Sequence, residues 1–360
     1  THIHSDMKRL RRLNLFQETI RLFLREFEKK EPGQFISLLP DELIKRYQKQ
    51  TSGYFGQVKP SEAKEKLDQA ARDLFLLVET CKDQEPIRQW KSYKLLQRLM
   101  SDQCIVVGQG EDPKIEMIEP KEVASNALQN PSDPDATYDG HKGKGYQVQM
   151  AETCNPDNPV QLITCAIPQT AADDDGEALA PVVAHLEAAD LKPKELLADT
   201  LYGSDRNQQL CESKDIELLA PVRGPKPKKG LPPITDVQKR LAARREMEQT
   251  DEWKQRYKLR AGIEGTHSGA KRKVEVGKLR VRGKPSVFNV VLLKLTGWNI
   301  FRAAAAMIRK GKRPIKGQKA TSTTDILVWL TTFGLRLLDL TGLLHPQRPH
   351  PMPAPTPLAA

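Results

Sequence analysis

Four chemically active side chains stand at helical spacing in the segment Tyr257-Lys-Leu-Arg260-Ala-Gly-Ile-Glu264-Gly-Thr-His-Ser-Gly-Ala-Lys271. Its tyrosine, arginine, glutamate and lysine occupy offsets 0, 3, 7 and 14, which fall close to one face of an α-helix. A carboxylate binds divalent cations, and guanidinium and ammonium groups bind phosphates. Any single pair of these charges is typical of a solvated helix face, but the whole set favours phosphodiester chemistry.

Two upstream blocks accompany this segment. They are Leu196-Leu-Ala-Asp199-Thr-Leu-Tyr202-Gly203-Ser204 and Asp139-Gly-His141-Lys-Gly-Lys-Gly145-Tyr146-Gln-Val-Gln. Together with the Y-x2-R-x3-E-x6-K pattern of residues 257–271, they resemble the catalytic core of DDE-type insertion-sequence transposases. The resemblance covers most of residues 1–310. It implies an α/β fold of the RNase H-like kind, a mixed sheet with flanking helices, carrying a large N-terminal helical insertion.

The resemblance also implies a catalytic pair. Asp199 matches the second acid of the family's triad and Glu264 the third, and together they would hold Mg²⁺ or Mn²⁺ in a two-ion site. Two such ions activate the attacking oxygen and stabilise the leaving oxygen of a phosphodiester. Asp199 follows a short apolar run, and ligands of α/β sheets bind at the carboxyl ends of strands. A helix cap or a turn is the alternative role for this aspartate.

The first acid of the triad has no clear counterpart. Thr1-His2-Ile3 resembles the end of the strand that carries it, which predicts an aspartate just before Thr1 and a truncated chain. The competing assignment places it in Ser132-Asp133-Pro134-Asp135, with Asp135 as the candidate, or at Asp139. Those acids lie among turn residues, which more often cap or bend the chain than bind metal.

DNA is the expected partner. By resemblance, Arg260 and Lys271 would hold phosphates near the cleaved bond, and Tyr257 would hydrogen-bond a phosphate or stack on a displaced base. His267, one turn after Glu264, is more typical of packing. The remaining candidate DNA contacts are the cations that follow the signature: Arg272, Lys278, Arg280 and Arg282.

The distribution of charge supports a polyanionic partner. The chain carries a formal net charge of +11, and residues 221–320 hold 27 Lys and Arg against 7 Asp and Glu. The five cysteines are dispersed and form no zinc-binding spacing, which favours reduced thiols in a cytoplasmic, nucleoid-associated protein. We expect double-stranded DNA as substrate, assembly of a homo-oligomer on it, and no membrane association.

Patterning divides the chain into five parts. Residues 1–105 read as a helical, DNA-contacting insertion, 106–144 as an irregular connector, and 145–310 as the catalytic domain. Within the last, residues 287–308 predict a core helix in which Trp298 packs. Residues 311–345 combine a basic linker with an apolar stretch that favours a packed helix over a membrane span. The proline-rich end, 346–360, is expected to be disordered.

These patterns predict a transposase that cleaves DNA and transfers its strands. One alternative is a catalytically incomplete DNA-binding remnant, which would bind DNA with strong salt dependence but never cut it. Another is a nuclease of the same fold, which would hydrolyse DNA without joining strands.

Overall fold

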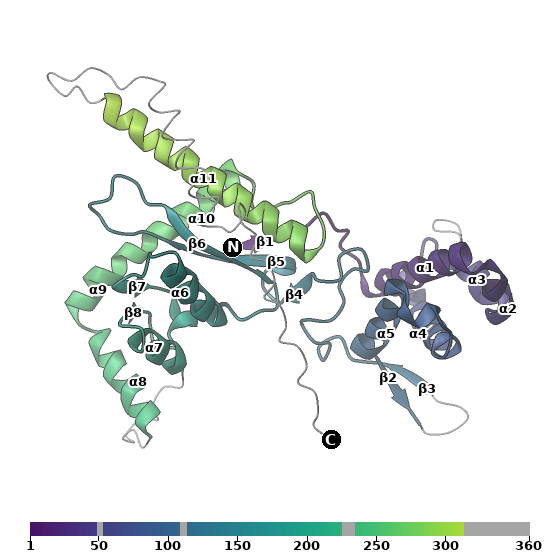
Figure 1. Ribbon diagram of the computed structural model, residues 1–360. Helices are drawn as coiled ribbons and strands as arrows, with labels where there is room; N and C mark the ends of the chain where they lie inside the picture. The colour runs from purple at the N-terminus through teal and green to yellow at the C-terminus, as the bar shows by residue number, and fades with distance from the viewer. Residues whose placement is uncertain (49–52, 109–113, 225–234, 313–360) are drawn as a thin grey trace, which may run out of the picture. The chain divides into compact units, whose positions relative to one another are not determined.

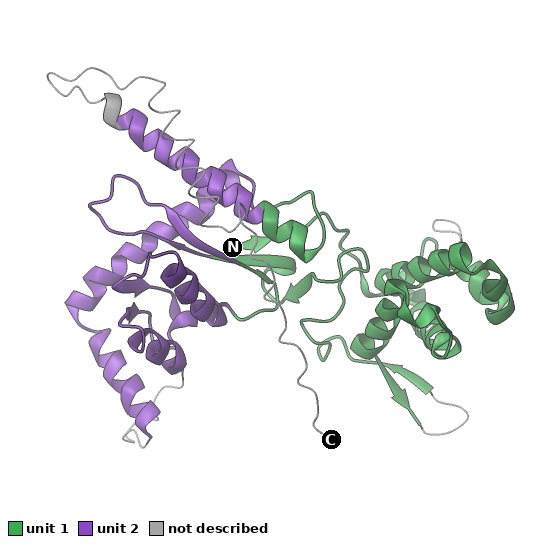
Figure 2. Ribbon diagram, viewed as in Figure 1, with its two compact units in different colours: residues 1–149, 168–174, 277–290 green, residues 150–167, 175–276, 291–360 purple. Residues whose placement is uncertain are grey.

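The structure is a computed structural model that describes residues 1–48, 53–108, 114–224 and 235–312. The chain divides into two compact units (Figures 1 and 2). Unit 1 contains residues 1–149, 168–174 and 277–290, and the rest of the described chain forms unit 2. Three of the boundaries fall inside strands β5 (Gly143–Glu152) and β6 (Ile163–Thr170) and helix α11 (Lys284–Lys312), so the segment predicted as one catalytic domain contributes to both units.

Helices dominate the first part of unit 1, as predicted. An apolar residue recurs every three or four positions along α1, where Phe16, Phe23 and Phe27 are fully buried. They share one core with Leu74 of α4 and Tyr93 of α5. The elements are α1 (Arg12–Lys30), α2 (Pro32–Leu38), α3 (Asp41–Gln48), η1 (Pro60–Glu62), α4 (Ala63–Cys81), η2 (Ile87–Gln89) and α5 (Lys91–Gln103).

Unit 1 also contains short strands, most of them where the sequence predicted an irregular connector. The expected irregular connector carries most of a hairpin of β2 (Cys104–Val107) and β3 (Lys114–Met117), and β4 (Thr137–Asp139) follows. A further strand, β1 (His2–Ile3), precedes the helices and pairs antiparallel with residues 146–147. Gly145 permits this close pairing, because a Cβ there would meet the Ile3 carbonyl oxygen. Strands as short as these depend on tertiary pairing more than on local preference.

The sheets differ from the single mixed sheet that was expected. Among the described strands, one sheet has the order β1-β5-β4, with β6 (Ile163–Thr170) also paired to β5 (Gly143–Glu152). A separate parallel pair joins β7 (Glu195–Leu197) to β8 (Glu217–Leu219). Parallel and antiparallel pairing thus both occur, and the α/β class is correct. The RNase H-like arrangement of all strands in one sheet stays a prediction.

The parallel pair forms a small strand–helix–strand layer in unit 2. Leu218 and Cys211 pack with Leu179 in one apolar cluster, which Tyr202 covers from the side. This cluster fixes the edge from which the chain leaves β7 toward Asp199. The helical elements between β6 and β8 are η3 (Asp175–Ala178), α6 (Leu179–Ala188), η4 (Thr200–Tyr202) and α7 (Asp205–Glu212).

The charged stretch that follows Thr235 forms several short helices rather than one continuous helix. Thr235 begins the first piece through a capping box with Gln238, and Thr250 caps the second by accepting from the Trp253 amide. A helix-capping threonine inside the charged stretch is the signal that the sequence interpretation overlooked. The pieces are α8 (Asp236–Met247), α9 (Asp251–Tyr257), η5 (Lys258–Ala261) and α10 (Gly262–Lys273).

Helix α11 (Lys284–Lys312) contains the predicted core helix. Val291, Leu295 and Trp298 are buried along one face, which confirms that Trp298 packs. Within the described chain, Lys284–Arg309 is the helix whose length and composition would allow it to cross a membrane, a test that core helices of soluble proteins also pass. The predicted basic linker and apolar stretch lie almost wholly outside the described residues, and the proline-rich end lies entirely outside them.

Candidate functional site

Asp199 lies in a tight turn directly after strand β7. Its Oδ1 accepts a hydrogen bond of 2.9 Å from the Leu201 amide and so caps the short helix η4. Gly203, four residues on, has no room for a side chain, because an added Cβ would lie 1.8 Å from the Pro221 carbonyl oxygen. Close packing against Pro221 therefore explains the glycine of the motif, and one carboxylate oxygen of Asp199 is used to stabilise the turn.

Arginines of the basic stretch hold this turn from outside. The Arg244 guanidinium donates to the carbonyl oxygens of Gly203 and Ala220, at 3.1 and 3.2 Å. The Arg223 amide donates to the same Gly203 oxygen. Burial lowers the pKa of Arg244, but a guanidinium remains charged. Positive charge in this region thus has a structural use that the sequence interpretation did not foresee.

The four signature residues occupy three consecutive elements rather than one helix. Tyr257 ends α9, Arg260 lies in η5, and Glu264 and Lys271 lie in α10. The 3₁₀ segment tightens the chain between Tyr257 and α10. Arg260 and Glu264, four residues apart, still face each other in an ion pair of 3.1 Å.

The two predicted catalytic carboxylates meet at one guanidinium. The Nη2 atom of Arg260 lies 3.8 Å from Oδ2 of Asp199 and 3.1 Å from Oε1 of Glu264. Those oxygens therefore cannot be farther apart than the sum of the two distances, although their residues are 65 positions apart in the chain. The Asp199 and Glu264 side chains are 41% and 64% exposed. We call Asp199, Arg260 and Glu264 the Arg260 cluster.

Tyr257 borders the Arg260 cluster. Its ring stacks on Trp253, with the centroids 4.6 Å apart and the planes 19° from parallel. Burial raises the pKa of the Tyr257 phenol, and although Arg260 lowers it, nearby Asp199 raises it further. The phenol therefore stays protonated and can donate a hydrogen bond to a phosphate oxygen. Its partner Trp253 carried no signal in the sequence interpretation beyond its four-residue spacing from Tyr257.

The donor set of the Arg260 cluster suits a hard divalent cation. Carboxylate oxygens are the ligands that Mg²⁺ and Mn²⁺ prefer, and both acids are open to solvent. Asp199 and Glu264 would hold such an ion, which would supply Lewis-acid stabilisation of charge on phosphate oxygens. In the part of the chain that the structure describes, no group of three His, Cys, Asp or Glu side chains has a metal-binding arrangement.

The alternative candidates for the first acid have structural partners. Asp139 is a turn residue, since its Oδ1 accepts from the amides of His141 and Lys142. Asp135 accepts from the Lys284 amide at 3.2 Å. Asp133 is fully buried and accepts from the Ser5 hydroxyl, the Tyr146 hydroxyl and a backbone amide. Asp139 is therefore a turn residue, whereas Asp133 and Asp135 join segments that are distant in the sequence.

The predicted DNA-binding cations fall into two groups. Lys271 and Arg272 are exposed in the last turns of α10, and Lys278 and Arg280 are exposed in the segment that follows it. Arg282 instead binds the backbone and side chain of Asp6. Other arginines of the basic stretch pair with acids: Arg240 is bidentate to Asp205, and Arg256 contacts Glu195 and Glu217. The net charge of the stretch therefore overstates what DNA can contact.

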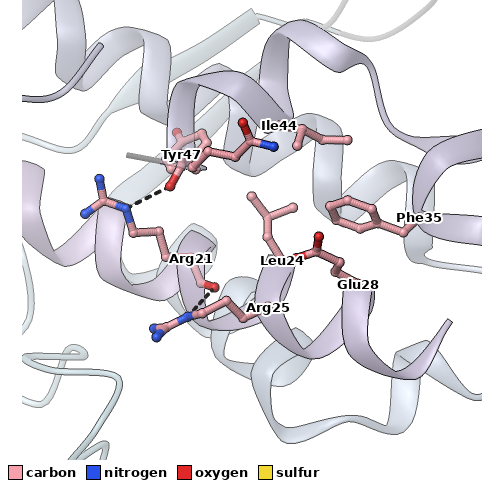
Figure 3. Close-up of a pocket in the computed structure, with 8 residues that line it drawn as sticks. Arg21, Leu24, Arg25, Glu28, Phe35, Ile44 and Tyr47 are labelled. Carbon is pink, nitrogen blue, oxygen red and sulfur yellow. Dashed lines mark hydrogen bonds between the residues drawn. The ribbon is translucent and has the colours of Figure 1, made fainter. Parts of the chain in front are cut away.

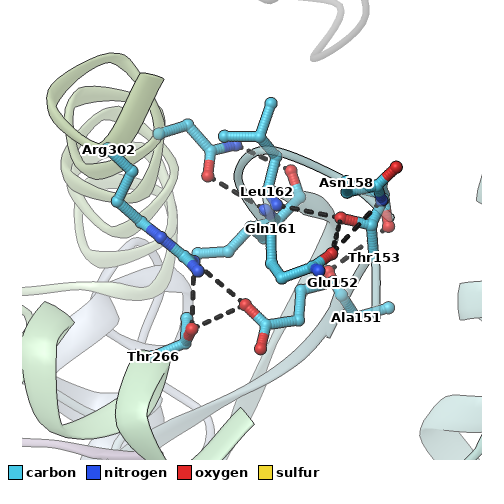
Figure 4. Close-up of polar contacts among 11 residues, drawn as sticks. Ala151, Glu152, Thr153, Asn158, Gln161, Leu162, Thr266 and Arg302 are labelled. Carbon is cyan, nitrogen blue, oxygen red and sulfur yellow. Dashed lines mark hydrogen bonds and ion pairs between the residues drawn. The ribbon is translucent and has the colours of Figure 1, made fainter. Parts of the chain in front are cut away.

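A second acid near α10 was not predicted from the sequence. Glu152, at the end of β5, is only 6% exposed and binds both Thr266 of α10 and Arg302 of α11 (Figure 4). We call these three residues the Glu152 cluster. An isolated glutamate in a strand has no spacing that marks it, and its burial becomes visible only in the fold.

His267 has the packing role that was expected. Burial, with Lys271 and Arg260 nearby, lowers its pKa to about 4. The imidazole is therefore neutral at neutral pH.

Unit 1 contains a hollow of about 170 Å³ between α1, α2 and α3 (Figure 3). Leu24, Phe35 and Ile44 form its apolar wall. Its two arginines are bound to the backbone, Arg21 to the Tyr47 carbonyl and Arg25 to the Arg21 carbonyl. Such contacts brace the helices.

Comparison with known proteins gives a match over part of the chain. Residues 223–304 match the family model described as "Transposase DDE domain". The matched segment includes Tyr257, Arg260, Glu264 and Lys271, and Asp199 precedes it. Neither the curated proteins nor the solved structures gave a match. The match supports a DDE-type transposase, as the motifs predicted.

Proposed function

We propose that the protein cleaves DNA at the ends of an insertion sequence and joins those ends to new DNA, using Mg²⁺ or Mn²⁺. One observation carries the proposal: Asp199 and Glu264, from distant parts of the sequence, converge on the same atom of Arg260. Both lie in blocks that resemble those of DDE transposases of the Y-x2-R-x3-E-x6-K group. Exposed carboxylates that converge, with cations beside them, suit a metal-dependent phosphodiester site.

The chain's own residues have distinct tasks in this reaction. Asp199 and Glu264 offer the metal-ligating oxygens. Tyr257, kept protonated, donates to a phosphate oxygen, and Lys271 and Arg272 attract the DNA backbone. Arg260 neutralises both acids in this structure, and a bound cation would take over that charge and release the guanidinium to a phosphate. We infer a cytoplasmic, DNA-bound homo-oligomer as the working form.

A strand-transfer assay on the full-length protein tests the proposal. We expect Asp199→Ala and Glu264→Ala each to lower metal-dependent cleavage by about 100-fold or more, because each removes a direct metal ligand. Glu246→Ala, an exposed acid of α8, is the matched control and should retain activity. Unchanged cleavage in either site variant would reject the assignment.

A DNA-binding remnant is the second candidate. It is favoured by the lack, among the described residues, of a three-acid cluster that could hold a metal. The same preparations decide between the two: a remnant binds DNA with a steep dependence on salt and yields no cut product with any divalent ion. A nuclease of this fold would give cut products that never join to target DNA.

A further inference from the structure

Three elements that are distant in the sequence are tied together at the Glu152 cluster (Figure 4). The Thr266 hydroxyl donates to Oε2 of Glu152 at 2.6 Å, and Nη1 of Arg302 donates to the same oxygen at 3.0 Å. Arg302 also donates to the Thr266 oxygen at 2.9 Å. The three contacts close a triangle between β5, α10 and α11. Glu152 and Arg302 form a partly buried ion pair, and Thr266 is the α10 residue that hydrogen-bonds to both of its members.

Helix α10 has two faces with different tasks. Thr266, Gly269 and Ala270 are buried on one face, at the spacing of a packed helix stripe. Glu264 precedes Thr266 by two residues, which is about 200° around the helix. Its side chain therefore points away from the buried face, in agreement with its 64% exposure. A rotation of α10 about its axis would change the position of the Glu264 carboxylate relative to Asp199.

A second contact supports the same face of α10. Gly269 lies against Trp298 of α11, and an added Cβ would be 2.4 Å from Cζ2 of that ring. The Arg302 guanidinium lies over the same ring, 6.0 Å from its centroid. The apolar contact fixes how closely α10 approaches α11. It is not directional, whereas the Thr266 hydrogen bonds are, so the threonine sets the rotation of the helix.

We propose that Thr266 is a positioning residue of the site: through Glu152 and Arg302 it sets the rotation of α10 and so directs Glu264 toward Asp199. This inference rests on the proposed function, because it assumes that the two acids hold a metal ion. Groups that orient metal ligands typically change metal affinity or activity by about 10- to 100-fold when removed. Thr266 would therefore affect the site without touching substrate or metal.

Valine in place of Thr266 tests the inference with little change of volume. Thr266→Val removes the hydroxyl but leaves the Glu152–Arg302 ion pair intact, so the buried charges stay compensated. Thr266→Ser keeps the hydroxyl and serves as the conservative rescue. Asn299→Ala is the matched control for stability, since Asn299 exchanges two hydrogen bonds with Ile163 and thereby ties α11 to β6 without α10.

The primary measurement is Mn²⁺ binding to the full-length protein, followed by electron paramagnetic resonance well below each variant's melting temperature. We expect about 10-fold weaker Mn²⁺ binding in Thr266→Val, recovery in Thr266→Ser and no change in Asn299→Ala. The salt-dependent affinity for DNA should be the same in all four proteins, and kcat rather than KM for cleavage should fall in Thr266→Val.

Two results would overturn the inference, and both can be distinguished from a failure of the proposed function. Mn²⁺ affinity in Thr266→Val within twofold of wild type would show that Thr266 only stabilises the fold. Equal losses of Mn²⁺ affinity in Thr266→Val and Asn299→Ala would show the same. Failure of the proposed function is detected by a different pair of samples, the wild-type protein and the Asp199→Ala variant. If these two bind Mn²⁺ equally, Asp199 is not a metal ligand, and the inference about Thr266 fails together with the proposed function.

Discussion

Two carboxylate–arginine clusters involve helix α10, and the solvent exposure of their side chains distinguishes their roles. In the Glu152 cluster the carboxylate is 6% exposed and the arginine 19%, whereas in the Arg260 cluster the two acids are 41% and 64% exposed. A buried pair cannot exchange its partner for an ion without a large cost, but an exposed pair can. The same chemistry therefore stabilises the fold at one cluster and stays available for ligands at the other.

The largest expected effect separates the two clusters by stability. Glu152→Ala leaves the Arg302 charge, whose side chain is 19% exposed, without its acidic partner, which should lower the free energy of unfolding by about 2 kcal/mol. Glu264→Ala removes only an exposed ion pair and should change it by less than about 0.5 kcal/mol. Urea unfolding followed by circular dichroism measures both. Equal losses in the two variants would break the comparison.

Acid should affect the buried side of α10 through His267. The folded-state pKa is about 4, below the unfolded value of 6.5, so between these pH values the unfolded chain binds a proton that the folded chain does not. Stability should therefore fall as the pH falls from about 6.5 to 4, by about 2 kcal/mol for this group. Unfolding curves of wild type and His267→Gln over that range should diverge toward acid. Parallel curves would exclude the effect.

Two glycines of α10 sharpen the comparison between its faces. Gly269→Ala should destabilise the protein by about 1 kcal/mol, since the new methyl group would overlap Trp298. Gly265→Ala meets nothing within 4 Å and should stabilise the helix by about 0.5 kcal/mol through helix propensity. Thermal unfolding distinguishes the signs, and a stabilising Gly269→Ala would contradict the packing described for α11.

The smallest effect concerns cations that are exposed or already paired. Arg272→Ala should reduce the slope of log affinity for DNA against log salt by about 0.9, one phosphate contact. Arg240 is already paired with Asp205, so Arg240→Ala should leave that slope unchanged. Fluorescence anisotropy with a duplex oligonucleotide at several salt concentrations gives both slopes. A matching reduction in Arg240→Ala would show that the ion pair opens to DNA.

The two clusters also show what the sequence reveals. Asp199 and Glu264 stand out because short motifs with fixed spacing surround them, and in the structure both side chains contact Arg260. Glu152 has no such setting, because its role depends on two helices that follow it by more than a hundred residues. The broken helix before α10 was recognisable in principle from Thr250. The pairing of the short strands was not, since strands of two to four residues depend on their neighbours rather than on local preference.

The central claim is that Asp199 and Glu264 share one ion site. Hydroxyl radicals generated by Fe²⁺ in the place of Mg²⁺ cut the backbone beside the ion, so fragment mapping reports which segments surround it. We predict two sets of cuts in the folded full-length protein, one near residue 199 and one near residue 264, both suppressed by excess Mg²⁺. Cuts near only one of these residues, or cuts that Mg²⁺ does not suppress, would contradict the account.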